Sequence, residues 1–308
     1  MPSHLFSRIL VTGASGQVGS QLVRALEPLG DVVAPTRAEL DLSSDASIRR
    51  CIRALQPRWI VNAAAYTAVD QAESEPALAH AINAEAPGII GEEAEAIDAP
   101  VIHFSTDYVF DGTNATPYLE TDPTAPLNVY GASKLAGESA LRQSCRGSLI
   151  FRTSWVYGAT GKNFLRTFLK LAHERDQLRI VADQHGAPTW SRDLASLIAH
   201  VIAQIEHEAA TEPVRLIYAA RYHRGIYHAA GSGETTWAGF ATEALRQLAE
   251  RDPSINLATI IPITTAEYPT PAARPLNSRL DCSKLDRTFN YNMMDWHNSL
   301  HQVLDELA

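Results

Sequence analysis

A short apolar strand that leads directly into a glycine-rich turn is the feature that most constrains the fold of this chain. Arg8–Thr12 has the character of a buried strand, and Gly13, Gly16 and Gly19 follow it at once, leading into apolar residues at helical spacing. Glycines at these positions let the turn tighten, let backbone approach a pyrophosphate and let the helix pack closely on the strand. The pattern predicts a dinucleotide site, with a purely structural turn as the alternative.

Further strands alternate with helical patterns over the first half of the chain. The five strands expected there are Arg8–Thr12, Asp31–Ala34, Trp59–Asn62, Val101–Ser105 and Leu149–Thr153. Such alternation predicts an α/β fold with a doubly wound parallel sheet of the Rossmann type. Between Val69 and Asp98, Pro76 and Pro87 indicate short helices rather than one long helix, because proline suits the first turn of a helix.

Beyond Gly158 the regular alternation stops, and no long linker separates the two parts of the chain. We therefore expect the chain to weave between two lobes. The NADP-binding Rossmann domain is predicted to comprise residues 1–158 and about 186–230. The smaller substrate-binding lobe is predicted to comprise about 159–185 and 231–308.

Composition limits the classes of partner. The 308 residues carry a formal net charge of −9 and no basic run, which argues against nucleic acid and against an anionic membrane surface. No uncharged run approaches a membrane span, and residues 1–8 lack the apolar region of a signal peptide. The cysteines Cys51, Cys145 and Cys282 are odd in number and far apart, which favours a reducing compartment. We expect a cytoplasmic protein.

The end of the second strand bears on the choice of cofactor. No carboxylate stands where a ribose-binding Asp or Glu would normally follow the strand, and Arg37 is there instead. A guanidinium at that point can pair with a 2′-phosphate, so NADPH is favoured and NADH is an accepted alternative. The other interpretation of Arg37 is a solvated surface arginine. After the third strand, Ala63, Ala64 and Ala65 offer small side chains over which a cofactor can lie.

Two groups of polar residues point to chemistry on a carbonyl or alcohol. Tyr130 and Lys134 are four residues apart, so on a helix they share a face, and a lysine there can lower the pKa of the tyrosine. Thr106 and Asp107 follow the fourth strand, at the sheet edge where ligands bind in open α/β folds. Taken in isolation, the Tyr–Lys pair is equally typical of an exposed helix face.

Five motifs together resemble the extended short-chain dehydrogenase/reductases, and within them most closely the dTDP-4-dehydrorhamnose reductase family. They are the glycine turn through Gly19, Ser105–Phe110, Tyr130-x-x-x-Lys134, Phe151–Tyr157 and Arg274-Pro275-x-Asn277-Ser278. The resemblance covers nearly the whole chain. It implies a nicotinamide cofactor and reduction of the C4 ketone of dTDP-4-dehydro-6-deoxy-L-mannose to dTDP-L-rhamnose, a precursor of the cell envelope.

The resemblance also implies roles for single residues. It makes Tyr130, Lys134 and Thr106 catalytic, and it places Asp107 and Trp155 on sugar-binding positions. The residues it implies along the cofactor are Gly16, Gln17, Val18, Asp41, Leu42, Ala63, Ala64 and Ala65.

The diphosphate of a nucleotide sugar needs local positive or donor groups in so acidic a chain. Asn163 and Arg274 are the candidates, and the alternative for Arg274 is that it ties down the Pro-rich loop. Some relatives hold a magnesium ion between subunits, but Gln21 and Arg192 stand at positions we associate with its ligands. We therefore expect no metal, and a homodimer remains an expectation.

Three related activities are the alternatives. A nucleotide-sugar 4,6-dehydratase needs a glutamate after the Thr–Asp pair, where this chain has Tyr108. A nucleotide-sugar epimerase usually lacks an aspartate like Asp107. A non-catalytic regulatory subunit of the methionine adenosyltransferase type binds NADP without turnover, and Trp155 favours the reductase over it because an indole offers an apolar platform with a donor at its edge.

Overall fold

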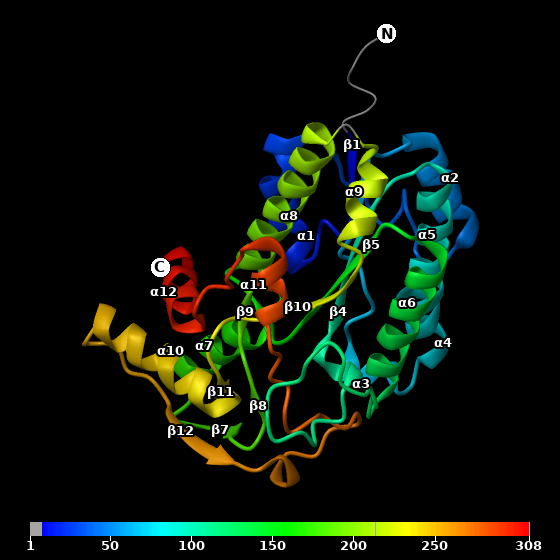
Figure 1. Cartoon of the computed structure of the whole chain (residues 1–308). Coiled ribbons are helices and arrows are strands. Elements are labelled where there is room, and N and C mark those ends of the chain that lie inside the picture. Colours follow the sequence, from blue (N-terminus) through cyan, green and yellow to red (C-terminus); the bar gives the residue numbers. More distant parts are fainter. Residues whose placement is uncertain (1–7, 213, 308) are drawn as a thin grey trace.

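A six-stranded parallel sheet forms the centre of the computed structural model, which describes residues 8–212 and 214–307 (Figure 1). The strand order is β10-β5-β4-β3-β1-β2, and every neighbouring pair is parallel. The strands are β1 (Arg8–Thr12), β2 (Asp31–Val33), β3 (Trp59–Asn62), β4 (Val101–Thr106), β5 (Ser148–Thr153) and β10 (Gly225–His228). The predicted Rossmann-type sheet is confirmed.

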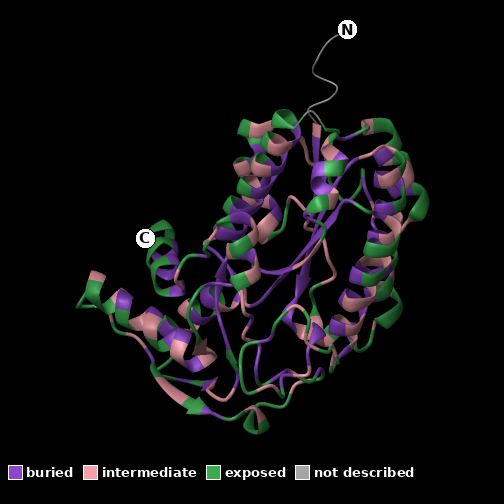
Figure 2. Cartoon of the chain, viewed as in Figure 1, coloured by how far each residue is buried: buried purple, intermediate pink, exposed green. Residues whose placement is uncertain are grey.

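Both faces of the sheet are covered by helices, which explains why its strands are apolar without interruption. Side chains alternate along each strand, so Ile9 and Val11 of β1 join one core and Leu10 joins the other. Figure 2 shows the strands as buried and the outer helix surfaces as exposed. The helices on the Ile9 face are α1 (Gln17–Leu26), α8 (Ser191–Thr211), α9 (Leu216–Tyr222) and α11 (Ser283–Phe289). Those on the Leu10 face are α2 (Asp45–Leu55), α5 (Ala86–Ala96) and α6 (Val129–Ser144).

The chain reverses its direction of winding at β1. It passes from β1 to β2 on one side and then returns to place β3 on the other side of β1. In an open parallel sheet such a switch leaves a crevice outside the carboxyl ends of the two strands. The glycine turn follows β1 at that edge, and Ala63 to Ala65 follow β3 there.

A second lobe is built on its own hydrophobic core, which includes Tyr157, Phe168, Trp190, Phe240 and Trp296. Figure 1 shows it beside the carboxyl edge of the sheet, at the lower left. Its strands are β6 (Val156–Tyr157), β7 (Gln177–Val181), β8 (His185–Gly186), β9 (Thr189–Trp190), β11 (Thr235–Thr236) and β12 (Thr259–Ile263). Its helices are α7 (Phe164–Glu174), α10 (Trp237–Arg251) and α12 (Trp296–Leu307). Because β10 lies between these segments in sequence, the chain enters the lobe, returns to the main sheet and enters it again.

Two details differ from the sequence prediction. The short helices expected between Val69 and Asp98 are wrong in part, because α4 (Pro76–His80) runs without a break through a π-helical turn, Ala81–Glu85, into α5. The wider turn accommodates Pro87, which has no N–H for a regular helical bond. Only α3 (Val69–Ala72) is separate. In addition, β12 and α9 were not predicted. Pro262 interrupts the strand pattern of β12, and α9 is only seven residues long, too short to show a clear helical period.

Within residues 8–212 and 214–307, no helix has both the length and the apolar character needed to cross a membrane. The first seven residues, where the sequence indicates no signal peptide, lie outside the described part of the chain.

Candidate active site

The glycine turn is shaped by contacts that only glycine permits. Gly13 has a φ of +70°, and a Cβ on it would lie 2.8 Å from the Cα of Ala64. A Cβ on Gly19 would lie 2.1 Å from the Gly13 carbonyl oxygen, so α1 can pack against β1 only with glycine there. Gly16, at the N-cap of α1, makes no side-chain cap, which leaves the first amides of the helix available. Free amides at a helix N-terminus bind phosphate oxygens well.

The other residues predicted around the cofactor lie along the same crevice. Gln17 begins α1 and is half-buried, Val18 packs on the core of the Ile9 face, and the three alanines after β3 are half-buried beside the turn. Asp41 accepts hydrogen bonds from the backbone and hydroxyl of Ser43, which lower the pKa of its carboxyl group. Leu42 is buried in the core, so it can offer a cofactor only its backbone.

The end of β2 carries a carboxylate that the sequence interpretation missed. Arg37 is exposed there, but Glu39 folds back and its Oε2 accepts hydrogen bonds from the Thr36 backbone N–H at 2.8 Å and from the Thr36 hydroxyl at 2.9 Å. These bonds lower the pKa of Glu39, so the group is ionised at neutral pH. No carboxylate follows the strand directly, as expected from the sequence, but the fold brings the carboxylate of Glu39 back to Thr36.

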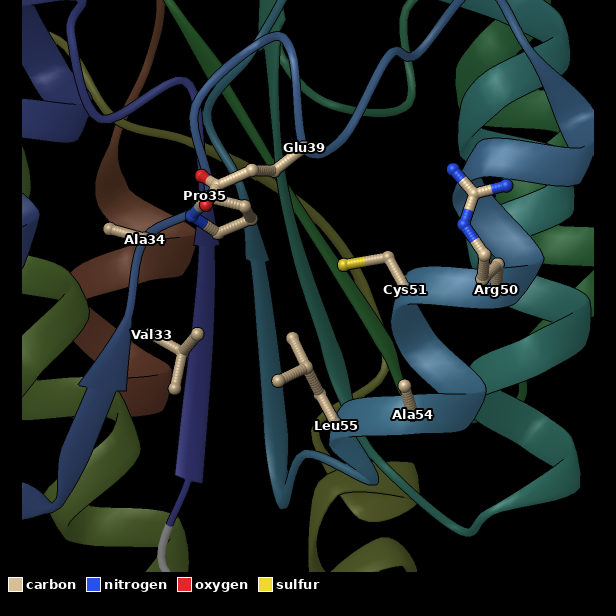
Figure 3. Close-up of a pocket in the computed structure, with 8 residues that line it drawn as sticks. All are labelled: Val33, Ala34, Pro35, Glu39, Arg50, Cys51, Ala54 and Leu55. Atoms are coloured by element: carbon tan, nitrogen blue, oxygen red, sulfur yellow. The ribbon is translucent and has the colours of Figure 1, made fainter.

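Glu39 also borders a cavity of about 400 Å³ between β2 and α2. Figure 3 shows Cys51 and Leu55 pointing from α2 toward the strands across this cavity. Its lining residues are Val33, Ala34, Pro35, Glu39, Arg50, Cys51, Ala54 and Leu55. Tyr130, Lys134 and Thr106 are not among these lining residues, so this cavity is not the place for the carbonyl chemistry.

The three residues predicted to be catalytic meet where β4 and α6 approach each other. Thr106 ends β4, and its side chain lies near the Tyr130 hydroxyl group. Asn128 caps α6 by accepting from the Gly131 N–H at 2.8 Å, which fixes the turn that carries Tyr130. Lys134 lies one turn further along and is buried, with Nζ donating to the Phe104 carbonyl at 2.6 Å. Thr106 of β4 and the Tyr130–Lys134 pair of α6 thus form one cluster, although they are separated in sequence.

The expected lowering of the Tyr130 pKa is wrong for the protein alone. Burial raises the pKa of Tyr130 to about 12, against the opposing effect of the nearby Thr106 side chain. Burial also lowers the pKa of Lys134 to about 8, only partly offset by the charge of Glu138. Near neutral pH the cluster therefore holds a neutral phenol beside an ammonium group, which is the pair that proton donation to a carbonyl requires.

Asp107 is a buried carboxyl group with one oxygen available. Its Oδ1 accepts from the Thr106 hydroxyl at 3.0 Å, the Ser278 side chain lies nearby and opposes the rise of its pKa, and Oδ2 has no partner. Burial raises the pKa of Asp107 to about 6. Ser278 belongs to the last sequence motif but had no predicted role. A buried acceptor without a partner is costly unless something that binds supplies a donor.

Trp155 is held between two parts of the second lobe. It has a φ of +49°, and its ring stacks on Trp237 with centroids 3.7 Å apart. A Cβ on Gly186 would lie 2.6 Å from Trp155 Cε2, so the indole also packs directly on that backbone. An open platform for a sugar ring was expected, but these contacts cover much of the ring surface. No sequence pattern pointed to Trp237, because its pairing with Trp155 depends on the tertiary fold.

The two candidates for the diphosphate have partners within the protein. Arg274 forms a two-pronged ion pair with Asp70, with N–O distances of 2.7 and 2.8 Å. Asn163 accepts from the Arg166 N–H at 3.0 Å as the cap of α7 and donates to Gln17 at 2.9 Å. Direct binding of a diphosphate by either residue would require it to exchange these partners, so both assignments stay predictions.

Metal ligands were not expected, and the described residues contain no group of three or more His, Cys, Asp or Glu side chains suited to a metal ion. Arg192 forms an ion pair with Glu306 at 2.5 Å.

Comparison with known proteins identifies the family. The model of the RmlD substrate binding domain family matches residues 7–308. The chain belongs to this family. A dTDP-4-dehydrorhamnose reductase from Burkholderia thailandensis is 46% identical over 302 residues, covering 97% of this chain and 99% of the relative. The dTDP-4-dehydrorhamnose reductase of Escherichia coli strain K12 is 44% identical over 303 residues, covering 97% of each chain.

Solved structures of RmlD-family reductases share the fold. A dTDP-4-dehydrorhamnose reductase from Clostridium acetobutylicum superimposes with a TM-score of 0.87 at 32% identity, covering 97% of this chain and 99% of that one. The Bacillus anthracis reductase, solved in complex with NADP, gives a TM-score of 0.85 at 32% identity, covering 98% and 99%. The predicted resemblance to extended short-chain dehydrogenase/reductases is confirmed.

Proposed function

We propose that this protein catalyses the NADPH-dependent reduction of the C4 ketone of dTDP-4-dehydro-6-deoxy-L-mannose to dTDP-L-rhamnose. Family membership and relatives of the same name over nearly the full chain support this activity. The observation that carries it is the cluster at the end of β4, where the Thr106 side chain and the Tyr130 hydroxyl group lie near each other, one helical turn from the buried Lys134. This cluster lies at the same edge of the sheet as the glycine turn, where a nicotinamide can reach it.

The residues of the crevice fit a dinucleotide. Gly13 and Gly19 let the turn pack closely against Ala64 and against its own backbone, where a Cβ would clash, and the uncapped first amides of α1 would bind the pyrophosphate oxygens. Gln17, the alanines after β3 and Lys134 would hold the rest of the cofactor. The chemistry that NADPH supplies when bound is a hydride for the C4 carbon.

The protein side of the reaction is proton donation and orientation. Tyr130, a neutral phenol, donates its proton to the C4 oxygen as that oxygen gains negative charge. The Thr106 hydroxyl hydrogen-bonds the same oxygen and polarises the ketone before reaction. Lys134, as an ammonium group, stabilises the tyrosinate left behind. The free Oδ2 of Asp107 accepts from a sugar hydroxyl and so fixes the ring.

Trp155, Arg274 and Asn163 are the candidates for binding the sugar and the diphosphate of the substrate. Trp155 would contribute the edge of its indole to the sugar, since Trp237 covers one face. Arg274 and Asn163 would approach the diphosphate from the second lobe after releasing Asp70 and Gln17. We also place the reaction in the cytoplasm, because all three cysteines are free. A homodimer remains part of the proposal, to be checked by light scattering.

One assay separates the candidate functions. NADPH oxidation is followed with dTDP-4-dehydrorhamnose and with its UDP and GDP counterparts. Turnover with the dTDP sugar supports the proposal, and preference for another base would correct the nucleotide. Oxidation with none of them, together with measurable NADPH binding, would favour the non-catalytic regulatory role. Interconversion of C4 epimers without net oxidation of NADPH would favour an epimerase.

A further inference from the structure

A line of buried hydrogen bonds runs beneath the crevice from the glycine-turn side to Lys134. The Ala64 N–H donates to Thr12 Oγ1 at 3.2 Å, and Thr12 Oγ1 lies 2.6 Å from Asn62 Oδ1. Asn62 Nδ2 lies 3.0 Å from His103 Nδ1, and His103 Nε2 lies 3.2 Å from Lys134 Nζ. Thr12, Asn62, His103 and Lys134 are each at most 2% exposed. Neighbouring strands β1, β3 and β4 each supply one link.

We propose that His103 is a positioning residue for the reduction and that it orients Lys134. It also links the charge of Lys134 to which partner donates in each hydrogen bond of this line. The inference rests on the proposed role of Lys134. No step of the reaction described above uses His103, although it is the one side chain in this line that contacts Nζ.

The coupling follows from the inventory of donors and acceptors. Burial, with the nearby charge of Lys134, keeps the pKa of His103 well below its usual range, so the ring is neutral and carries one proton. If Asn62 donates to Nδ1, that proton is on Nε2 and meets Lys134 as a donor, which suits only an uncharged amine. If the Asn62 amide is reversed, its oxygen accepts from Nδ1–H, and Nε2 accepts from the ammonium group. The ammonium state of Lys134 therefore requires the Nδ1–H tautomer of His103, and the Nε2–H tautomer becomes available only when Lys134 is uncharged.

Other titratable groups around Lys134 are paired elsewhere. Glu138, on the same helix, forms a buried ion pair with Arg152 of β5 at 2.7 Å. Tyr130 is neutral. The charge of Asp107 raises the pKa of Tyr130 and is not a cause of the lowered pKa of Lys134. The Lys134 ammonium group thus has two acceptors here, the Phe104 carbonyl oxygen and the His103 imidazole.

Two substitutions of His103 separate this role from simple packing. The amide of His103→Gln reaches about as far as Nε2 and can still accept from Lys134, whereas that of His103→Asn reaches about as far as Nδ1 and keeps only the Asn62 contact. A hydrogen bond to a charged group that is lost in His103→Asn lowers the pKa of Lys134 and loosens its position. We expect kcat of His103→Asn to fall roughly tenfold to a hundredfold. The alkaline limb of its pH–rate profile should move down by about one pH unit. The kcat of His103→Gln should stay within about threefold of the value for the unmodified enzyme.

The controls distinguish failure of this inference from failure of the proposed function. Lys134→Met tests the role of the lysine itself, and its full activity would overturn the assignment on which the inference rests. Thermal unfolding and NADPH binding are measured for each variant. Equal loss in the Asn and Gln variants, or an unmoved alkaline limb in His103→Asn, would overturn the role of His103 while leaving the reductase activity intact.

A measurement on the unmodified protein avoids any loss of folding. The ring nitrogen NMR shifts of His103, assigned by comparison with His103→Gln, report which nitrogen carries the proton. Between about pH 6 and about pH 10 the proton should move from Nδ1 to Nε2 as Lys134 loses its charge. A single tautomer over the whole range would exclude the coupling.

Discussion

Glu138 and Arg152 form a buried two-pronged ion pair that joins α6 to β5. Arg152 Nε and Nη2 donate to the two carboxylate oxygens at 2.8 and 2.7 Å, and each side chain is only 2% exposed. The pair supports the helix that carries Tyr130 and Lys134 from beneath.

Removal of one partner should destabilise the protein more than removal of both. Arg152→Met leaves the Glu138 carboxylate buried without its partner, which should cost about 3 to 5 kcal/mol of unfolding free energy. The double variant Arg152→Met with Glu138→Leu should recover much of that loss. Urea unfolding of both variants checks this, and equal stability of the two would show that the pair is not desolvated in solution.

Tyr130→Phe removes the donated proton with little change in volume. We expect kcat to fall by about 10² to 10⁴, the usual range for general acid catalysis. Binding of NADPH should survive, because the glycine turn and Lys134 are unchanged. The measurement is steady-state reduction of dTDP-4-dehydrorhamnose alongside a fluorescence titration with NADPH. A folded variant that binds NADPH and works at nearly the unmodified rate would remove Tyr130 from the mechanism.

The pH dependence of reduction should follow Lys134 rather than Tyr130. The Tyr130 pKa is raised to about 12, so the phenol keeps its proton throughout the working range. The Lys134 pKa is lowered to about 8, so the ammonium group is present below that value and lost above it. The rate of reduction should therefore fall as pH rises through about 8. Lys134→Met should abolish this limb along with most activity, and a limb that survives in it would have another origin.

Asp107 should lower the stability of the folded protein at neutral pH. Its folded pKa of about 6 lies above the ordinary 3.8, so ionisation in the folded protein is unfavourable and stability falls as pH rises between these values. The penalty at neutral pH is roughly 2 to 3 kcal/mol. Asp107→Asn should raise the unfolding temperature at about pH 7.5, much less at about pH 4.5, and raise the KM for the sugar. Loss of stability at neutral pH would contradict this.

Arg37 and Glu39 should act in opposite directions on the choice of cofactor. If the Arg37 guanidinium pairs with the 2′-phosphate as proposed, Arg37→Ala should raise the KM for NADPH by up to about tenfold and leave the KM for NADH nearly unchanged. Glu39→Gln keeps an acceptor for the Thr36 N–H but removes a negative charge near the ribose, so it should lower the KM for NADPH. Steady-state kinetics with both cofactors test this, and equal effects on NADH and NADPH would show that neither residue reads the phosphate.

Local patterns predicted the elements that hold the site, while contacts between distant segments were not predictable. The glycine turn and the Tyr130–Lys134 spacing follow from rules that act within one or two turns of chain. By contrast, Trp237 stacks on Trp155 only because β8 and β11 pair, and Glu39 reaches Thr36 only because the loop folds back. The lowered Tyr130 pKa failed as a prediction because burial, which a sequence does not give, raises that pKa, and the charge of Asp107 raises it further.

The late return of the chain to the main sheet has a consequence for how the protein is made. β10 completes the sheet by pairing with β5, yet it is translated only after the whole of β6 to β9 and α7 to α9. Until then the nascent chain presents β5 as an open edge. The two lobes should consequently unfold in one transition, and a fragment that ends near residue 158 should aggregate rather than bind dinucleotide.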